Sequence, residues 1–150
     1  MTQKTQLARM IALAAEYHDG QFDKQGQPYI LHPITVMHYL NSTDEELQCI
    51  AVGHDIIEDT AVTVYFLRSR GFSERVIAGI DAMTKREEES LESYKARIFA
   101  NKDAMLVKRA DLKHNSDITR LRGVTDKDIA RISKYHQFYL EINEKLAEIA

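Results

Sequence analysis

Proline is nearly absent from this sequence, and that absence constrains the fold more than any other feature. The 150 residues contain two prolines, Pro28 and Pro33, where a chain of this length usually holds about seven. Proline breaks the interior of a helix, because it has no backbone N–H and its ring clashes with the preceding turn. The long remainder of the chain after Pro33 therefore contains nothing that forbids helix.

The spacing of apolar residues indicates helices along the whole chain. Apolar side chains recur every three or four residues, as one face of a helix requires. The segments with this spacing are 7–15, 32–40, 47–57, 64–70, 76–83, 91–98, 107–118 and 129–146. The expected helix ends are Gly20 after the first helix, Thr43 with Glu46 as a capping box, and the caps Ser73, Asp103 and Thr125. The sequence therefore predicts an all-α bundle that forms one domain over residues 1–150.

Composition and charge exclude several classes of protein. One cysteine, Cys49, cannot form an internal disulfide. No apolar run is long enough for a membrane span or a signal peptide. A net charge of −3 with 29% charged residues provides no basic field for nucleic acid. We expect a cytoplasmic protein whose main partner is neither a nucleic acid nor a membrane.

Polar residues interrupt the apolar faces at chemically informative positions. His54 lies on the apolar face of segment 47–57, and Asp111 lies on that of segment 107–118. A carboxylate buried without a partner is costly, so Asp111 should be paired, protonated or bound to a metal. His32 lies where a polar loop meets a helix.

The spacing within residues 54–59 matters for the chemistry. Residues four apart share one helix face, so His54 lies beneath Glu58, and Asp55 beneath Asp59. The adjacent histidine and aspartate can offer one nitrogen and one oxygen to the same ion. Imidazole and carboxylate together suit manganese, iron or zinc better than calcium. Such an ion lowers the pKa of a bound water, and nearby carboxylates can then position that water or move protons.

Each of these residues also has a plain structural interpretation. A single histidine on an apolar face is usually a hydrogen-bonded core residue. Acids at the start of a helix favour the helix dipole, which accounts for Asp44, Glu45 and Glu46 without any site. Asp111 can pair with a lysine or an arginine. Spacing alone leaves both a metal site and a structural network open.

Five motifs together carry a resemblance to a known family. They are His18-x-Gly20-Gln21, Gly26-x-Pro28-Tyr29-Ile30-x-His32-Pro33, His54-Asp55-x-x-Glu58-Asp59-Thr60, Thr84-Lys85 and Val107-Lys108-x-Ala110-Asp111-x-x-His114-Asn115. In this order and with these intervals they resemble the HD-superfamily hydrolase domain of RelA/SpoT-type enzymes, from about residue 7 to 121. The chain is too short for the synthetase and regulatory domains of the long enzymes, so it looks like a stand-alone small alarmone hydrolase.

The resemblance implies a helical bundle around one divalent ion, usually Mn²⁺, with iron, zinc or cobalt as alternatives. The implied metal ligands are His32, His54, Asp55 and Asp111. The residues implied to activate water and handle protons are Glu58 and Asp59. The residues implied to contact substrate are Lys24, Tyr29, Lys108 and Asn115.

The activity implied by the resemblance is removal of pyrophosphate from the ribose 3′ position of guanosine tetra- and pentaphosphate alarmones. Two other functions fit the same residues. One is a phosphohydrolase of another nucleotide, such as an adenosine alarmone, a nucleoside mono- or triphosphate or an RNA 3′ pyrophosphate. The other is a catalytically silent nucleotide-binding module, which would not need both Glu58 and Asp59.

Three positions depart from the pattern of the family. Asp23 stands where the family usually has arginine, Arg109 where it has leucine, and Asp117 where it often has arginine. Two of these changes replace a cation with an acid in segments expected to meet the nucleotide. They predict altered substrate recognition unless Arg109, Arg120 or Arg122 compensates. The choice between a guanosine and an adenosine substrate stays open.

The remaining histidines, the cysteine and the last helix have structural interpretations. We expect His38 and His136 to be structural, and His18 and His114 to pack or to hydrogen-bond behind the ligands. Cys49 should be partly buried. The aromatic residues Tyr135, Phe138 and Tyr139 fit the core or the surface of a homo-oligomer equally well.

Overall fold

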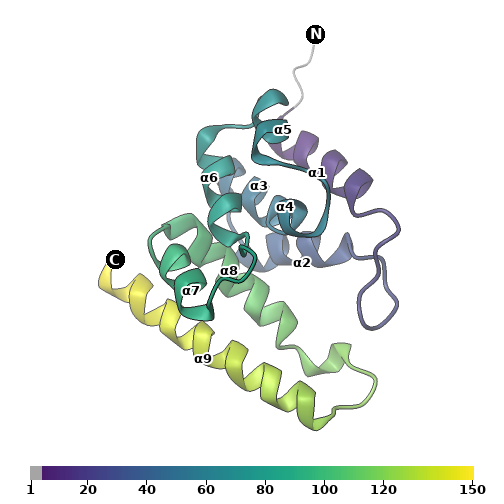
Figure 1. The fold of residues 1–150 in the computed structure, drawn as a ribbon, viewed down its shortest axis with the longest axis vertical. Helices are drawn as coiled ribbons and strands as arrows, with labels where there is room; N and C mark the ends of the chain where they lie inside the picture. Colours follow the sequence, from purple (N-terminus) through teal and green to yellow (C-terminus); the bar gives the residue numbers. More distant parts are fainter. Residues whose placement is uncertain (1–4) are drawn as a thin grey trace.

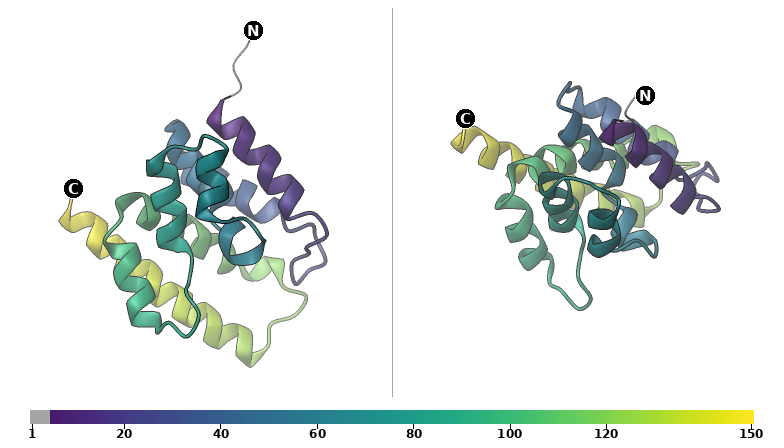
Figure 2. Two further views of the ribbon diagram at one scale, coloured as in Figure 1. Left: turned by 45° about the horizontal axis from the view of Figure 1, so that its top comes forward. Right: turned by 90° about the horizontal axis from the view of Figure 1, so that it is seen from above.

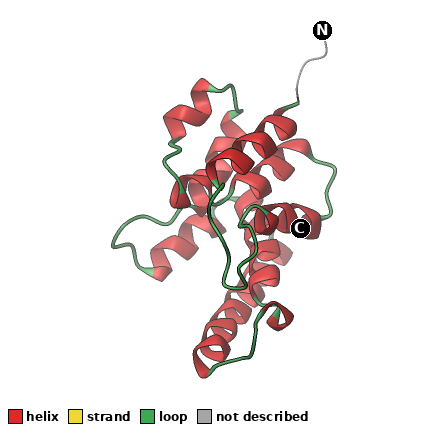
Figure 3. Ribbon diagram, turned by 90° about the vertical axis from the view of Figure 1, so that its right-hand side faces the viewer, coloured by secondary structure: helices red, strands yellow, loops and turns green. Residues whose placement is uncertain are grey.

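Nine α-helices and one 3-10 turn account for most of residues 5–150, the part of the chain that the computed structural model describes. The helices are Gln6–Tyr17 (α1), Leu31–Leu40 (α2), Glu45–Gly53 (α3), Ile56–Asp59 (α4), Val64–Ser69 (α5), Glu74–Met83 (α6), Leu91–Phe99 (α7), Lys102–Asn115 (α8) and Asp126–Glu148 (α9), and the 3-10 turn is Ile118–Arg120 (η1). Figure 3 shows helices and loops without a strand in this range. The all-α class predicted from the sequence is confirmed.

Two central helices organise the packing. α3 packs against α1, α2, α6 and α8, and α8 packs against α2, α3, α6, α7 and α9. Figures 1 and 2 show α1 and α9 on opposite sides of the molecule, with the other helices between them. The side chains that meet between α2, α3 and α8 therefore lie inside the bundle. None of the helices in residues 5–150 is long and apolar enough to cross a membrane.

Capping side chains set most of the helix starts. The predicted caps Ser73 and Thr125 are confirmed, since their hydroxyls accept hydrogen bonds from the backbone N–H of Val76 and Asp128. Thr125 and Asp128 bond each other's backbone reciprocally, which makes a capping box at the start of α9. Two elements of the fold thus begin where the sequence predicted.

Two predicted caps are wrong by one or two residues. α3 begins after Asp44 rather than Thr43, and the Asp44 carboxylate accepts from the N–H of Leu47. α8 begins after Asn101 rather than Asp103. The carboxylate of Asp103 instead binds the side chain of Arg75 on α6, with Nε and Oδ2 2.8 Å apart.

Two helices end earlier than the apolar pattern predicted. α3 ends at Gly53 instead of continuing through residue 57, so His54 and Asp55 lie in the turn before α4. α8 ends at Asn115, and the expected core residue Ile118 is 54% exposed in η1. The break before α4 is decisive, because it turns two polar side chains toward the space between α2 and α8.

The core is packed closely where α3 meets α6. A Cβ atom on Gly79 would lie 2.5 Å from Cδ1 of Ile50, so a larger residue here would displace that buried side chain. Cys49 of α3 is fully buried rather than partly buried as expected, and burial raises the pKa of its thiol to about 12. Of the aromatic residues on α9, Phe138 belongs to the core, whereas Tyr135 is partly exposed.

Candidate metal centre

Four polar side chains from three places in the chain meet at the centre of the bundle. They are the four predicted metal ligands, His32 of α2, His54 and Asp55 of the turn after α3, and Asp111 of α8. One donor atom from each of His32, His54 and Asp55 lies within 4.8 Å of the other two. Oδ1 of Asp111 lies 2.8 Å from Nε2 of His32 and 3.3 Å from Nε2 of His54. Oδ2 of Asp55 lies 3.0 Å from Nε2 of His54.

His54 supplies the observation that tests whether a cation fits here. Its Nδ1 lies 2.7 Å from the carbonyl oxygen of Ala51, which can only accept, so Nδ1 carries the proton. Nε2 then presents a lone pair, is completely buried and has no hydrogen-bond partner in residues 5–150. It faces carboxylate oxygens of Asp55 and Asp111. Lone pairs facing one another repel unless a proton or a metal ion lies between them, and two imidazoles with two carboxylates suit a divalent transition-metal ion.

The pKa shifts within the cluster also indicate a site that attracts a cation. Burial alone would lower the pKa of His54, but the charges of Asp55 and Asp111 raise it well above its ordinary value. Burial alone would raise the pKa of Asp111, but Lys108, His32 and His54 hold it well below the usual range. Both directions have one cause, since ionised carboxylates in a buried site attract positive charge.

His114 orients one of the predicted ligands from behind. Its Nδ1 lies 2.7 Å from Nδ1 of His32, and the two rings are stacked with their centroids 5.0 Å apart. Burial and the charge of Arg120 lower the pKa of His114 to about 4, so His114 is neutral at pH 7. If Nε2 of His32 faces the cluster with its lone pair, its Nδ1–H donates to His114, which fixes the tautomer and the ring orientation. The predicted hydrogen-bonding role of His114 is confirmed.

Three of the four residues implied to contact substrate bond the carboxylates of the cluster. Nζ of Lys108 lies 3.0 Å from Oδ2 of Asp111, and Nδ2 of Asn115 lies 3.0 Å from Oδ1 of the same residue. The hydroxyl of Tyr29 donates to Oδ2 of Asp55 over 2.5 Å. Tyr29 and Asn115 also line the neighbouring cleft, as does the exposed Lys24. Lys108 does not line that cleft, and its contact with substrate stays a prediction.

The two acids implied in water activation lie on the short helix α4. Oε1 of Glu58 accepts from the backbone N–H of Lys85 over 2.7 Å, which gives the Thr84-Lys85 motif a structural role. Burial and the charges of Asp55 and Glu58 raise the pKa of Asp59 to about 6. A carboxyl group with a pKa this close to neutrality can both take up and release a proton at physiological pH.

Two residues of the first motif, His18 and Gln21, lie behind Asp59, and His18 packs and hydrogen-bonds as expected. His18 is 1% exposed, and its Nδ1 lies 2.8 Å from Oε1 of Gln21. The side-chain amide of Gln21 donates in turn to the backbone carbonyl of Asp59 over 2.8 Å. These bonds tie the end of α1 to α4. Of this pair only Gln21 was not assigned a role from the sequence, although it stands in the His18-x-Gly20-Gln21 motif.

A cleft of about 290 Å³ opens beside the cluster at His32. Its lining residues come from the loop before α2 and the start of α2, from the end of α8 and the segment around η1, and from α9. They are Phe22, Asp23, Lys24, Gln25, Tyr29, His32, Asn115, Asp117, Arg120, Leu121, Arg131 and Tyr135. Figure 1 shows the loop before α2 and the connection between α8 and α9 on the same side of the molecule. The cleft combines three cations, two carboxylates and aromatic rings, and it leads to the four-residue cluster at His32.

Of the three positions that depart from the family pattern, two lie at this cleft and one lies on another face. Oδ1 of Asp23 accepts from the backbone N–H of Gln25 and Gln27, and its Oδ2 lies 3.5 Å from the guanidinium of Arg120. Asp23 therefore stabilises its own loop and holds Arg120 at the cleft. Asp117 caps η1 and lines the cleft as well. Arg109 lies away from the cleft, so it cannot compensate for these acids.

The fold and the site together define the class. The described part of the chain is an all-helical domain in which an adjacent histidine and aspartate meet a second histidine and a second aspartate in a buried, cation-attracting cluster. This is the arrangement of an HD-type domain.

Comparisons with known proteins give the more particular relationship. No family model matches the chain. A guanosine-3′,5′-bis(diphosphate) 3′-pyrophosphohydrolase of Haemophilus influenzae is 34% identical over 116 residues, which are 69% of this chain and 17% of that protein. A GTP pyrophosphokinase of Myxococcus xanthus is 31% identical over 137 residues, which are 81% and 18%. The bifunctional (p)ppGpp synthase/hydrolase SpoT of Escherichia coli is 30% identical over 122 residues, which are 73% and 17%.

The chain thus spans less than a fifth of the length of these relatives. A solved structure of a metazoan ortholog of SpoT superposes with a TM-score of 0.75 at 23% identity, over 99% of this chain and 96% of that one. This likeness shows a common fold. The resemblance to the RelA/SpoT-type HD hydrolase domain is confirmed, and the chain is related to these enzymes in sequence.

Proposed function

We propose that the chain is a divalent-metal-dependent phosphohydrolase that removes pyrophosphate from the ribose 3′ position of guanosine tetra- or pentaphosphate. The observation that carries the proposal is the unpartnered Nε2 of His54, which faces two carboxylates beside a cleft lined by cations. The names of the related pyrophosphohydrolases support the choice of reaction. In this proposal residues 1–150 form one hydrolase domain that acts in the cytoplasm.

The proposed cofactor is one Mn²⁺ ion held by His32, His54, Asp55 and Asp111. When bound, a divalent ion lowers the pKa of a coordinated water and offsets charge on a phosphoryl oxygen. The chain's own contribution is a fixed donor set, since the backbone of Ala51 and the ring of His114 orient the two imidazoles. Iron, zinc and cobalt have similar ligand preferences and are the alternatives.

Proton transfer is assigned to the acids of α4. We assign Asp59 as the group that exchanges the proton, because its pKa of about 6 lies close to physiological pH. We assign Glu58, which the Lys85 N–H holds in place, to orient the attacking water. The hydrogen bond from Gln21 to the Asp59 carbonyl limits movement of α4 during this step.

The nucleotide is assigned to the cleft. Lys24, Arg120 and Arg131 offer three cations there to phosphate groups, of which Arg120 also contacts Asp23 and Arg131 binds Asp128. Tyr29 and Asn115 link the cleft to the cluster, because both line it and both bond cluster carboxylates. The 3′ pyrophosphate would accordingly point inward and the base outward, toward Leu121 and Tyr135.

A product-resolved turnover assay with manganese-loaded protein tests the proposal. The substrates are guanosine tetraphosphate, its adenosine counterpart, and ordinary nucleoside mono- and triphosphates. We expect pyrophosphate from the 3′-pyrophosphorylated nucleotides and no product from Asp55→Ala. Release of inorganic phosphate or tripolyphosphate from ordinary nucleotides would identify a different phosphohydrolase. Stoichiometric binding without any turnover would identify a binding module.

A further inference from the structure

A second pocket lies on the opposite face of α8 from the metal cluster. It measures about 400 Å³ and lies where α8 meets the end of α2, the start of α3 and α9. Its lining residues are Tyr39, Leu40, Ser42, Leu47, Leu106, Arg109, Ala110, Lys113 and Tyr139. Residues three or four apart share a helix face, so Arg109 and Lys113 point away from the cluster residues Lys108 and Asp111. One helix therefore separates two distinct sites.

The two cations of this pocket have no acidic partner. The guanidinium of Arg109 donates to the neutral side-chain amide of Asn143 over 3.2 Å. The ammonium of Lys113 lies 4.8 Å from the centroid of the Tyr39 ring. Within residues 5–150, neither cation lies within 4.0 Å of a carboxylate, and no carboxylate lines the pocket. By contrast, Arg75 binds three acids on neighbouring helices.

Two unpaired cations in a concave site indicate an anionic ligand. An arginine guanidinium can bind a phosphate through two parallel hydrogen bonds, and a lysine adds a point charge. The hydroxyl of Ser42 provides a further polar contact at the same rim. Because the chain as a whole has a net charge of −3, this local positive charge is not a consequence of its composition.

The rest of the pocket suits an apolar, ring-bearing group. Leu40, Leu47 and Leu106 provide aliphatic surface, and the tyrosines Tyr39 and Tyr139 provide aromatic rings. Aromatic pairs prefer offset or edge-to-face arrangements, which tyrosines on two different helices allow. The volume lies in the range of sites that hold small ligands. We propose that this pocket is a second binding site of the protein, for a nucleoside phosphate.

The pocket also contacts the residues behind the metal cluster. The Tyr39 ring meets the His114 ring edge-on, with centroids 5.7 Å apart and an interplanar angle of 77°. His114 in turn is stacked on His32. Only the rings of Tyr39 and His114 would thus separate a ligand in this pocket from the cluster residue His32. The binding site itself does not depend on the proposed hydrolysis, so the two proposals can fail separately.

Titration of zinc-loaded, isotope-labelled protein with GDP, followed by NMR, tests the site. GDP has no 3′ pyrophosphate and is not a substrate in the proposed reaction. We expect saturable shifts at Tyr39, Lys113 and Tyr139. Shifts confined to cleft residues such as Lys24 and Asn115 would overturn the proposal.

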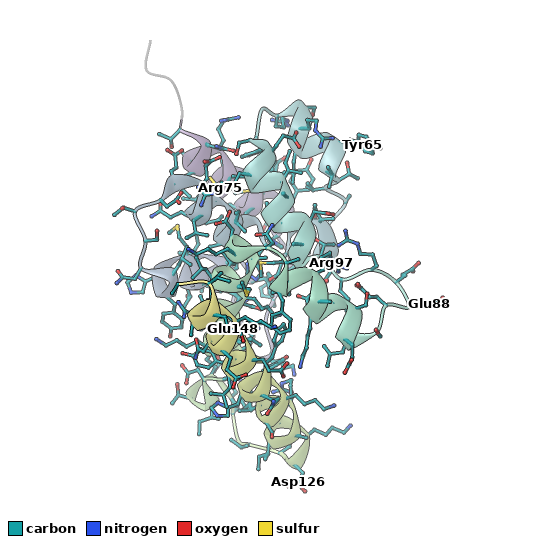
Figure 4. All side chains as sticks on the ribbon, turned by 90° about the vertical axis from the view of Figure 1, so that its left-hand side faces the viewer. Tyr65, Arg75, Glu88, Arg97, Asp126 and Glu148 are labelled. Atoms are coloured by element: carbon teal, nitrogen blue, oxygen red, sulfur yellow. The ribbon has the colours of Figure 1, made fainter. Side chains whose placement is uncertain are left out.

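Variants and a second ligand sharpen the test. Arg109→Leu should weaken binding at this pocket by about tenfold or more, as expected for losing a charge-assisted phosphate contact. The matched control is Arg68→Leu on α5, which changes the net charge equally. No residue of α5, which Figure 4 marks by Tyr65, lines the pocket. Equal binding by wild type and Arg109→Leu would contradict the site, and Lys113→Gln provides an independent variant.

Inorganic pyrophosphate should bind more weakly than GDP, and equal binding would exclude the nucleoside contact.

Discussion

The cluster of His32, His54, Asp55 and Asp111 and the cleft beside it are neighbours, but they are held in place differently. The cluster histidines His32 and His54 are 4% and 2% exposed, and each is fixed from behind by a hydrogen bond. In the cleft, Phe22 is 65% exposed, and Asp23 and Arg120 are joined by one long contact of 3.5 Å. A buried network is disrupted by a single replacement, whereas a half-buried pair joined by one long contact can exchange charges at a lower cost. This explains how the ligand motifs can persist while the recognition residues change.

The largest expected effect comes from removing a predicted ligand. Asp55→Ala should abolish Mn²⁺ binding and lower turnover at least about a thousandfold, because the ion supplies several kcal/mol of transition-state stabilisation. The measurements are metal content after desalting and pyrophosphate release. Asp126→Ala, at the exposed start of α9, is the control. Unchanged metal content in a folded Asp55→Ala protein would remove Asp55 from the ligand set.

The next largest effect is expected from removing His114, which hydrogen-bonds the predicted ligand His32. His114→Ala removes the acceptor of the His32 ring and should weaken Mn²⁺ binding by about 10- to 100-fold, the usual effect of losing such a partner. Equilibrium metal titration measures it. His38→Ala, an exposed histidine on the same helix as His32, should change nothing. If the two variants bind metal equally well, the orientation of His32 does not depend on His114.

A third prediction concerns thermal stability, and here the substitution is expected to produce a gain rather than a loss. Asp59 has its pKa raised from 3.8 to about 6, so the folded, metal-free protein holds this proton more tightly than the unfolded chain does. Ionisation therefore costs stability, increasingly as the pH rises from about 4 to about 6, and the full cost persists at pH 7. Asp59→Asn should raise the melting temperature at pH 7 by roughly a few degrees, since solvent screens a partly exposed group.

Thermal unfolding at several pH values checks this prediction. The difference between Asp59→Asn and wild type should shrink as the pH falls from about 6 to about 4. A variant less stable than wild type at pH 7 would mean that the neighbouring acids do not strain the folded state.

The smallest expected effect lies in the cleft. Asp23→Asn keeps a side-chain oxygen for the loop but removes the charge that holds Arg120. We expect KM to change by less than about tenfold with kcat and metal affinity unchanged, because the lost ion pair is long and only half-buried. Asp23→Ala also removes the loop hydrogen bonds and should have the larger effect. A lowered kcat in Asp23→Asn would show that cleft and cluster are coupled.

Local signals predicted the helices, but distant partners decided some of their ends. Ser73 and Thr125 could be found because a cap bonds backbone three residues away. Thr43 and Asp103 were predicted as caps, but the neighbouring residues Asp44 and Asn101 cap these helices instead. The sequence does not reveal that Arg75 on α6 would bind both Asp44 and Asp103, at 2.8 Å each.

The same contrast holds for the site. Ordered motifs identified all four side chains that the structure brings together, since each stands at a recognisable interval. The Asp23–Arg120 contact joins residues 97 positions apart, and no local pattern indicates it. The turn that separates α3 from α4 was also missed, because an unbroken apolar stripe at 47–57 gives no sign of it. Tertiary packing overrides periodicity where polar side chains must be turned inward.

The complete burial of the single thiol provides a natural reporter of molecular opening. Cys49 can react with a thiol reagent only when α3 separates from its neighbours, because its sulfur is inaccessible and its pKa is about 12. The labelling rate therefore follows the fraction of molecules that are transiently open. An ion or nucleotide that binds only the closed form slows labelling in proportion to its occupancy. The affinity of either site can thus be measured by thiol chemistry alone, with no dye and no turnover.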